Sequence, residues 1–259
     1  MRLGLDAKKD EVLLAAKYGF DYLEISLDWL LTSPKEIVDE TESMMKEHGL
    51  RAEVLNCFFN PSVKLLGEER DMHQIADIIH KNLEMSMRMN AEVVVIGSGK
   101  ARSLPDGYCL KKAKEEFGEI VDLCATEFSK NGIKIVVEPI RRAESNFINT
   151  VLEGVDFAKG INNPNLGYMV DLFHFYQNGE NLCDLDLLKG QLTHAHIARP
   201  NLDRNGPKPE DEETIRLWMQ KLKEIGYDDR LTLECIWTPD IEIAMEDTAR
   251  IMPLMRGEF

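Results

Sequence analysis

IKIVVEPIRRAESNFINT, residues 133–150, is the stretch from which the fold of this chain can be worked out. It begins with the apolar run IKIVV, which is too short and too dense in β-branched residues for a surface helix and so predicts a buried strand. Pro139 cannot donate to a strand ladder and favours extended geometry before it, so the strand should end at Glu138. A buried carboxylate without a partner is unfavourable, and Glu138 should therefore be protonated, paired or bound to a metal. A helix N-cap or a salt bridge to Arg141 or Arg142 would also explain it.

Strands and helices alternate along the rest of the chain on both sides of this stretch. The predicted strands are Arg2–Leu5, Tyr22–Ser26, Ala52–Phe58, Glu92–Gly97, Ile133–Glu138, Gly167–Asp171, Leu192–Ile197 and Leu231–Ile236. The predicted helices are Lys8–Lys17, Ser33–Gly49, Asp71–Met89, Tyr108–Lys130, Leu152–Lys159, Asp184–Leu188, Glu210–Ile225 and Ile241–Met255. Eight strand–helix units with no linker or compositional break favour one domain over residues 1–259. Repeated crossovers of this kind make a parallel sheet, so we predict an α/β protein with a single (β/α)8 TIM barrel.

The composition is that of an ordinary globular protein, with 44% hydrophobic and 30% charged residues, although 259 residues would also permit two small domains. A formal net charge of -15 argues against nucleic acid as a partner, because such binding needs clustered Lys and Arg. No apolar run approaches the ~20 residues of a membrane span, and the start lacks a secretory signal. The five cysteines are scattered and show no CxxC, which indicates reduced thiols and a cytoplasmic location.

Four chemically active residues stand at the ends of four successive predicted strands. They are Glu138, Asp171, His196 and Glu234, spaced about 30 residues apart as expected of successive β-helix-β units. Because reactive groups of a (β/α)8 barrel gather at the carboxyl ends of its strands, these side chains should share one mouth. Three carboxylates that close together would repel, and a divalent cation would relieve the repulsion. Oxygen-rich ligation with one nitrogen suits Mn²⁺, Mg²⁺ or Co²⁺ better than structural zinc. Four separate salt bridges to Lys and Arg at the rim are the alternative.

The motifs at these strand ends resemble those of the sugar phosphate isomerase/epimerase superfamily, the xylose-isomerase-like barrels, and are most similar to those of the ketose 3-epimerases, such as D-tagatose and D-psicose 3-epimerase. The similarity covers essentially the whole chain. The motifs are GFDYLEI (19–25), IGSG (96–99), EPIRRAESNFINT (138–150), VDLFH (170–174), HAHIARP (194–200) and LTLEC (231–235).

The resemblance implies that Glu138, Asp171, His196 and Glu234 bind one divalent metal ion, with Mn²⁺ the first choice and Mg²⁺, Co²⁺ or Zn²⁺ as alternatives. It implies that Glu138 and Glu234 also act as the acid/base pair on opposite faces of the substrate. Substrate contacts carried over in the same way are Glu144, His174, Arg199 and Gly97. We expect Glu24 and His194 to be structural residues inside the barrel.

Three departures from the family pattern leave the substrate open. The segment LDAKKD after the first strand lacks the aromatic residues that usually wall the sugar pocket. Arg141-Arg142 replace the usual Asn-Arg, and Ala198 stands where epimerases often carry a glutamate. The cationic residues that follow strand ends could make the mouth locally basic, which would suit a phosphorylated or carboxylated sugar; they are Lys100, Arg102, Arg141, Arg142 and Arg199.

The hypothesis for function is therefore a metal-dependent isomerase or epimerase of carbohydrate metabolism that acts on a keto sugar or sugar phosphate. It would work through a cis-enediolate, with 3-epimerisation favoured over aldose–ketose isomerisation. A dehydratase using the same chemistry on a sugar or keto acid is an alternative. An endonuclease-IV-like phosphodiesterase fits less well, because it needs further histidines where the third and fourth strands end in Asn56 and Gly97. The expected partner is a small sugar, with no nucleic acid or membrane; assembly into a homo-oligomer stays open.

Overall fold

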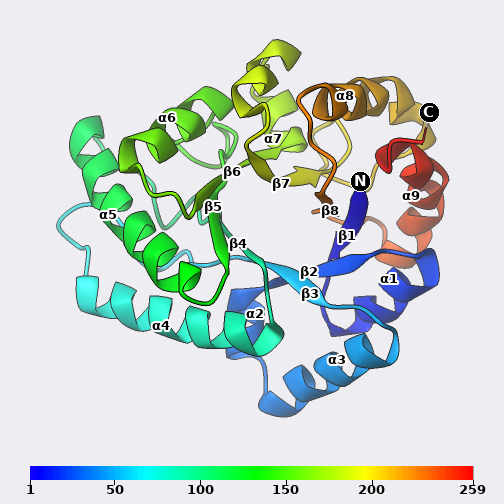
Figure 1. Ribbon diagram of the computed structural model, residues 1–259, viewed down its shortest axis with the longest axis horizontal. Helices are drawn as coiled ribbons and strands as arrows, with labels where there is room; N and C mark the ends of the chain where they lie inside the picture. Colours follow the sequence, from blue (N-terminus) through cyan, green and yellow to red (C-terminus); the bar gives the residue numbers. More distant parts are fainter. Residues whose placement is uncertain (259) are drawn as a thin grey trace.

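Eight parallel strands close into a barrel in the computed structural model, which describes residues 1–258 (Figure 1). Each strand pairs with the next along the chain, and β8 returns to β1, where Leu3 is in register with Leu231. The closed parallel barrel confirms the predicted (β/α)8 fold. The strands are β1 (Arg2–Asp6), β2 (Tyr22–Ser26), β3 (Ala52–Asn56), β4 (Val93–Ile96), β5 (Lys134–Val137), β6 (Leu166–Asp171), β7 (Leu192–Ile197) and β8 (Arg230–Leu233).

Helices connect successive strands and form a ring around the barrel (Figure 1). They are α1 (Val12–Tyr18), α2 (Leu27–Thr32), α3 (Lys35–Glu47), α4 (Met72–Met89), α5 (Leu110–Ser129), α6 (Val151–Ile161), α7 (Leu172–Gln177), α8 (Glu212–Glu224) and α9 (Ile241–Met255). Short 3₁₀ helices are η1 (Lys9–Glu11), η2 (Leu182–Leu188) and η3 (Pro209–Asp211). The closing helix has the predicted limits, whereas the first and seventh predicted helices, Lys8–Lys17 and Glu210–Ile225, begin as 3₁₀ turns, and the one near residue 184 is entirely 3₁₀.

The helices α2 and α7, which directly follow strands β2 and β6, were absent from the sequence prediction. A capping side chain explains each of them, because it starts a helix with no intervening loop. Ser26 accepts a hydrogen bond from the Trp29 backbone N–H, and Asp171 accepts bonds from the Phe173 and His174 N–H groups. Both helices are short, and their apolar composition shows no helical period, so their sequences read as continuations of strands.

Four strands end earlier than predicted: β4 and β5 by one residue, at Ile96 and Val137, and β3 and β8 by two or three. Strand β3 stops at Asn56 because Cys57 has φ 51°, a left-handed conformation that cannot continue a strand. Strand β8 stops at Leu233, although the N–H of Glu234 still donates to the carbonyl of Ile197 at 3.2 Å. Glu234 therefore keeps a position fixed by the sheet even though it lies just beyond the strand.

Side chains alternate between the barrel interior and the helix-facing layer, as the period of a strand requires. Val93 and Val95 belong to a small inner cluster, whereas Val94 and Ile96 pack in the main core beneath the helices. The inner cluster consists of Tyr22, Val54, Val93, Val95, Val136 and Met169. The apolar interior is thus filled by side chains, and polar groups are left to gather at the carboxyl ends of the strands.

Within residues 1–258, no helix combines the length and apolar character needed to cross a membrane. The five cysteines, all within this range, are free thiols.

Candidate metal centre

Side chains from four adjacent strand ends converge at the carboxyl end of the barrel. Glu138, Asp171, His196 and Glu234 each offer one ligand atom, and these atoms all lie within 4.8 Å of one another. His196 Nδ1 is 3.3 Å from Glu138 Oε1 and 3.0 Å from Glu234 Oε2. Glu138, Asp171 and His196 are at most 5% exposed. The structure thus brings together the four residues that the strand ends predicted, while their role as metal ligands stays a prediction.

The end of β5 is shaped to admit the carboxylate of Glu138. Its N–H donates to the carbonyl of Ile96 at 3.2 Å, and its own carbonyl accepts from Arg102 Nη2 at 2.6 Å. A Cβ atom on Gly97 would lie 2.5 Å from Glu138 Oε2, so only glycine leaves the carboxylate its present place. The predicted substrate contact Gly97 therefore adjoins Glu138 directly. Arg102 is fully buried and does not lie on the rim where the sequence placed it.

The two carboxylate oxygens of Asp171 have different roles: one caps a helix and the other faces the cluster. Its Oδ1 caps α7 by accepting from the N–H groups of Phe173 (2.7 Å) and His174 (3.2 Å). Its Oδ2 points into the cluster, where His174 Nε2 lies 3.6 Å away. The cap holds the carboxylate in one orientation, so the same interaction that begins the helix also aims the second oxygen. The predicted substrate contact His174 is buried beside the cluster, 3.8 Å from Glu138 Oε1.

Glu24, a buried residue of β2, shares a hydrogen bond with the imidazole of His196 on the side away from the cluster. Glu24 Oε1 lies 3.0 Å from His196 Nε2, and Glu24 Oε2 lies 3.0 Å from His194 Nε2. All three side chains are fully buried. They also lie close enough together to be considered as a second metal site, but each histidine already shares a hydrogen bond with Glu24. Glu24 and His194 were predicted as structural; the structure adds that Glu24 leaves Nδ1 of His196 to face the carboxylates.

The two glutamates of the cluster have pKa values displaced in opposite directions. Burial, reinforced by the nearby charge of Glu234, raises the pKa of Glu138. Burial also acts to raise the pKa of Glu234, but the Arg204 guanidinium and His196 overcome it and hold that pKa at about 2. A pair of carboxyl groups separated in this way is suited to having one member carry a proton while the other is ionised.

Arg204 is the cation of the site that sequence reasoning missed. It lies in the loop between β7 and η3, and its Nη2 contacts Asp171 Oδ2 at 2.8 Å and also Glu234 Oε2. Its Nη1 lies 3.1 Å from His174 Nε2, and its guanidinium stacks 5.0 Å from the centre of the Phe173 ring. Nothing in the local sequence distinguishes it from a solvated loop arginine, because its position depends on the path of the loop.

Arg199, which the sequence favoured because it follows β7 directly, faces other carboxylates. Its Nε is 3.3 Å from Asp211 Oδ2, and its Nη2 contacts Glu210. Neither partner belongs to the four-residue cluster. Glu144, a further predicted substrate contact, pairs with Arg141 at 2.6 Å, and both line the mouth. The expected basic rim is therefore largely neutralised by acidic neighbours.

Asp6 is a further carboxylate at the mouth that the sequence prediction placed in a loop. The first strand runs one residue longer than predicted, so Asp6 is in fact the last residue of β1. Its Oδ1 accepts a hydrogen bond from Asn56 Nδ2 at 3.2 Å. Burial and the charges of Glu234 and Glu24 raise its pKa well above the usual range. Reading the residue that closes every strand would have found it.

Two cavities open at this end of the barrel, one of about 430 Å³ and one of about 270 Å³. Asp6 and Cys235 line both, and Glu234 and Arg204 line the smaller one. The cavities therefore adjoin the cluster and could admit a small molecule.

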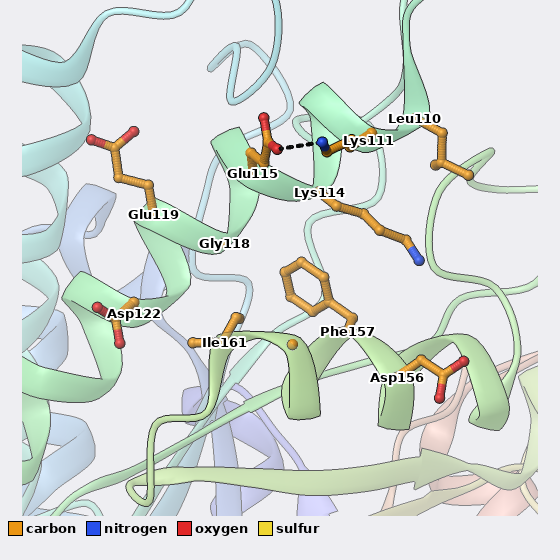
Figure 2. Close-up of a pocket in the computed structure, with 11 residues that line it drawn as sticks. Leu110, Lys111, Lys114, Glu115, Gly118, Glu119, Asp122, Asp156, Phe157 and Ile161 are labelled. Atoms are coloured by element: carbon orange, nitrogen blue, oxygen red, sulfur yellow. Dashed lines mark ion pairs between the residues drawn. The ribbon is translucent and has the colours of Figure 1, made fainter.

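A larger hollow of about 670 Å³ lies between α5 and α6 on the outside of the barrel. Figure 2 shows its floor formed by Phe157 and Ile161, with Lys111 and Glu115 paired at its edge. No residue of the four-residue cluster lines it. The outer hollow is the larger of the candidate binding sites by volume. The barrel mouth is the better candidate, because the four potential ligand residues lie there.

Comparison with known proteins identifies the family of the chain. A family model described as Xylose isomerase-like TIM barrel matches residues 12–253. An inosose isomerase from Bacillus velezensis is 23% identical over 261 residues, which cover 93% of this chain and 88% of that protein. A probable ketose 3-epimerase from Synechocystis sp. is 28% identical over 138 residues, which cover 52% of this chain and less than half, 46%, of that protein.

Among solved structures, that of the IOLI protein, described with a binding zinc atom, superposes with a TM-score of 0.77. It covers 100% of this chain and 99% of the other, at 19% sequence identity. This likeness independently supports the barrel fold.

Proposed function

The chain belongs to the xylose isomerase-like TIM barrel family, and on this premise we propose that it is a metal-dependent isomerase or epimerase of a keto sugar. One observation carries the proposal: two glutamates of displaced pKa approach the same imidazole nitrogen. His196 Nδ1 lies within 3.3 Å of an oxygen of Glu138 and of Glu234. Such a pair is suited to removing a proton from a carbon and returning one.

The donor set suits a divalent ion. Glu138 Oε1 and His196 Nδ1 are buried and form no well-aligned hydrogen bond among the described residues, although they lie 3.3 Å apart, whereas buried polar atoms ordinarily have such a bond. Three carboxylates and one imidazole favour Mn²⁺, with Mg²⁺, Co²⁺ or Zn²⁺ as alternatives. The similar IOLI structure is described with a binding zinc atom, which supports the choice of a divalent ion. An ion held by these residues would act as a Lewis acid, which lowers the barrier to ionising a carbon next to a carbonyl.

The protein's own side chains would move the protons. One of Glu138 and Glu234 takes the proton from the carbon beside the carbonyl, and the resulting enediolate is then protonated again. Return to the same carbon from the opposite face inverts it, and return to the neighbouring carbon exchanges ketose and aldose. We favour inversion at carbon 3, in keeping with the relative named a probable ketose 3-epimerase. His174 and Glu144, beside the cluster and at the mouth, would contact substrate oxygens.

The test replaces each glutamate without changing its shape. Glu138→Gln and Glu234→Gln should each lower the exchange of the substrate α-hydrogen with deuterated solvent by roughly a hundredfold or more, as expected for loss of a positioned acid or base. Exchange would be followed by NMR with D-fructose and D-tagatose as first substrates and Mn²⁺ supplied.

Glu115→Gln, which alters a carboxylate on the outer surface of α5, is the matched control and should leave exchange unchanged. Undiminished exchange in both active-site variants would remove the two glutamates from the chemistry.

A further inference from the structure

The guanidinium of Arg204 pairs with carboxylate oxygens of Asp171 and Glu234, which are also candidate ligands of a divalent ion. Its Nη2 donates to Asp171 Oδ2 at 2.8 Å and contacts Glu234 Oε2. Two of the four candidate ligands are thereby paired with a fixed positive charge. Glu138 Oε1 and His196 Nδ1 do not contact Arg204; they lie 3.3 Å from each other and form no well-aligned hydrogen bond among residues 1–258. The cluster is therefore divided into two carboxylates paired with Arg204 and a Glu138–His196 pair that Arg204 does not reach.

Several contacts hold Arg204 in this position. The carbonyl of Arg204 accepts from Ile236 N at 2.8 Å, and its Nε donates to the carbonyl of Glu234 at 3.2 Å. The ring of Phe173 packs against the guanidinium, and the side chain is only 13% exposed. The residue adopts φ 52°, a left-handed conformation unfavourable for a side chain of this size. The surrounding contacts must therefore stabilise the arrangement by more than this local strain.

We propose that Arg204 is an internal counter-ion that competes with the divalent ion for Asp171 and Glu234 and thereby sets the metal affinity of the site. This inference rests on the proposed metal-dependent function. Two cations at the same pair of oxygens repel strongly in a buried site, so binding of the ion displaces the guanidinium from at least one carboxylate. Glu138 and His196, which Arg204 does not reach, would hold the ion without such competition. The free energy of metal binding is then reduced by the free energy of breaking the Arg204 pairs.

A purely long-range effect of positive charge would have a different signature. Arg199 lies in the same loop, five residues earlier, but its guanidinium pairs with Glu210 and Asp211 and not with the cluster. Removing the charge of Arg199 tests the general influence of a nearby cation on metal binding. Removing Arg204 tests that influence plus direct competition, and the difference between the two variants isolates the competition.

The experiment titrates metal into the whole protein after treatment with EDTA and dialysis. Wild type, Arg204→Gln, Arg204→Lys and Arg199→Gln would be titrated with Mn²⁺ by calorimetry, and with Co²⁺ followed by its visible absorption. Arg204→Gln should bind about tenfold or more tightly than wild type, which corresponds to about 1.4 kcal/mol at 25 °C. Arg204→Lys should lie between them, because one ammonium cannot reproduce the forked contact. Arg199→Gln should stay within about twofold of wild type, since the charge of Arg199 is already balanced by Glu210 and Asp211 outside the cluster.

Thermal unfolding supplies a second readout that does not depend on catalysis. In EDTA, Arg204→Gln should unfold at a lower temperature than wild type, because Asp171 and Glu234 then repel without a cation between them. Saturating Mn²⁺ should close or reverse this gap. If Arg204→Gln does not fold in EDTA, the titration of Arg204→Lys carries the test.

Equal or weaker metal binding by the Arg204 variants would overturn the counter-ion role while leaving the proposed function standing. An increase of the same size in Arg199→Gln would also overturn it, by assigning the effect to charge in general. If no protein in the series binds Mn²⁺ or Co²⁺, the proposed function fails together with this inference.

Discussion

The two nitrogens of His196 face different environments. Nε2 shares a hydrogen bond with the buried carboxylate of Glu24, and Nδ1 faces Glu138 and Glu234. Although burial disfavours the charged form, Glu24 and Glu234 raise the pKa of His196 well above its usual range. The carboxylate of Glu24 therefore decides which nitrogen carries a hydrogen towards the barrel interior and which is presented at the mouth.

At this scale we predict that Glu24→Gln lowers the affinity of the site for Mn²⁺ by about 10- to 100-fold, the usual effect of removing a carboxylate behind a metal-binding histidine. The amide keeps the shape of the side chain but can accept from the two imidazoles only through one oxygen. Calorimetric titration of the EDTA-treated protein would measure the change.

Thr232→Val is the control, because Thr232 is equally buried and bonds Tyr22 and, at 3.4 Å, His194, but makes no hydrogen bond to Glu24 or His196. It should reduce stability without altering metal affinity. Unchanged affinity in Glu24→Gln would show that the fold alone orients His196.

At the scale of single elements, α6 begins with a stabilising capping box and has a glycine of low helix propensity near its C-terminus. Thr150 accepts from Glu153 N, and the Glu153 side chain accepts from Thr150 N, a capping box that fixes the first turn. Near the other end, Gly160 has open space around its Cα and contributes only backbone flexibility. Gly154, in the first turn, is different, because a Cβ there would lie 2.9 Å from Pro139.

We predict that Gly160→Ala stabilises the protein by roughly 0.5–1 kcal/mol, the difference in helix propensity between the two residues. Urea unfolding at pH 7 would measure it. Gly154→Ala is the matched comparison within the same helix and should give no gain or a loss, because it crowds the residue that follows Glu138. Equal gains from both substitutions would mean that the close approach of Pro139 has no energetic effect.

At the scale of the whole molecule, an ion network closes the amino-terminal end of the barrel. Glu53 on β3 accepts from Arg2 on β1 at 2.6 and 2.8 Å and from Arg230 on β8 at 2.9 Å. Arg230 also contacts Glu92, the residue before β4. The network ties the first and last strands to the middle of the sheet, so it stabilises the seam where the chain ends meet.

We predict that Glu53→Ala lowers the free energy of unfolding at pH 7 by about 3 kcal/mol, because it leaves two arginines without their shared carboxylate. Burial opposes ionisation of Glu53, but Arg2 and Arg230 prevail and lower its pKa below the usual 4.5. A lowered pKa contributes stability that is present above pH 4.5 and is lost as the pH falls through the folded-state value.

The gap between wild type and Glu53→Ala should therefore shrink in urea unfolding at pH 3 compared with pH 7. Glu40→Ala, which breaks an exposed pair with Lys9, should change stability by less than about 1 kcal/mol. A gap for Glu53→Ala that is independent of pH would exclude the ion network as its cause.

The sequence by itself determined the barrel and the four side chains of the candidate metal centre. Strand periods of two residues, repeated crossovers and carboxyl-end positions are local or topological properties, so the sequence alone places Glu138, Asp171, His196 and Glu234 together. Their juxtaposition follows because parallel neighbouring strands end at one edge.

Only the tertiary structure decided which groups neutralise that cluster. Arg204 reaches Asp171 and Glu234 because of the path of a loop, and Glu24 reaches His196 across the barrel from β2 to β7. The short helices after β2 and β6 likewise depend on single capping side chains that a periodic pattern does not register. Such contacts join residues far apart in sequence, and their geometry is set by packing and electrostatics in the closed barrel, not by any local pattern.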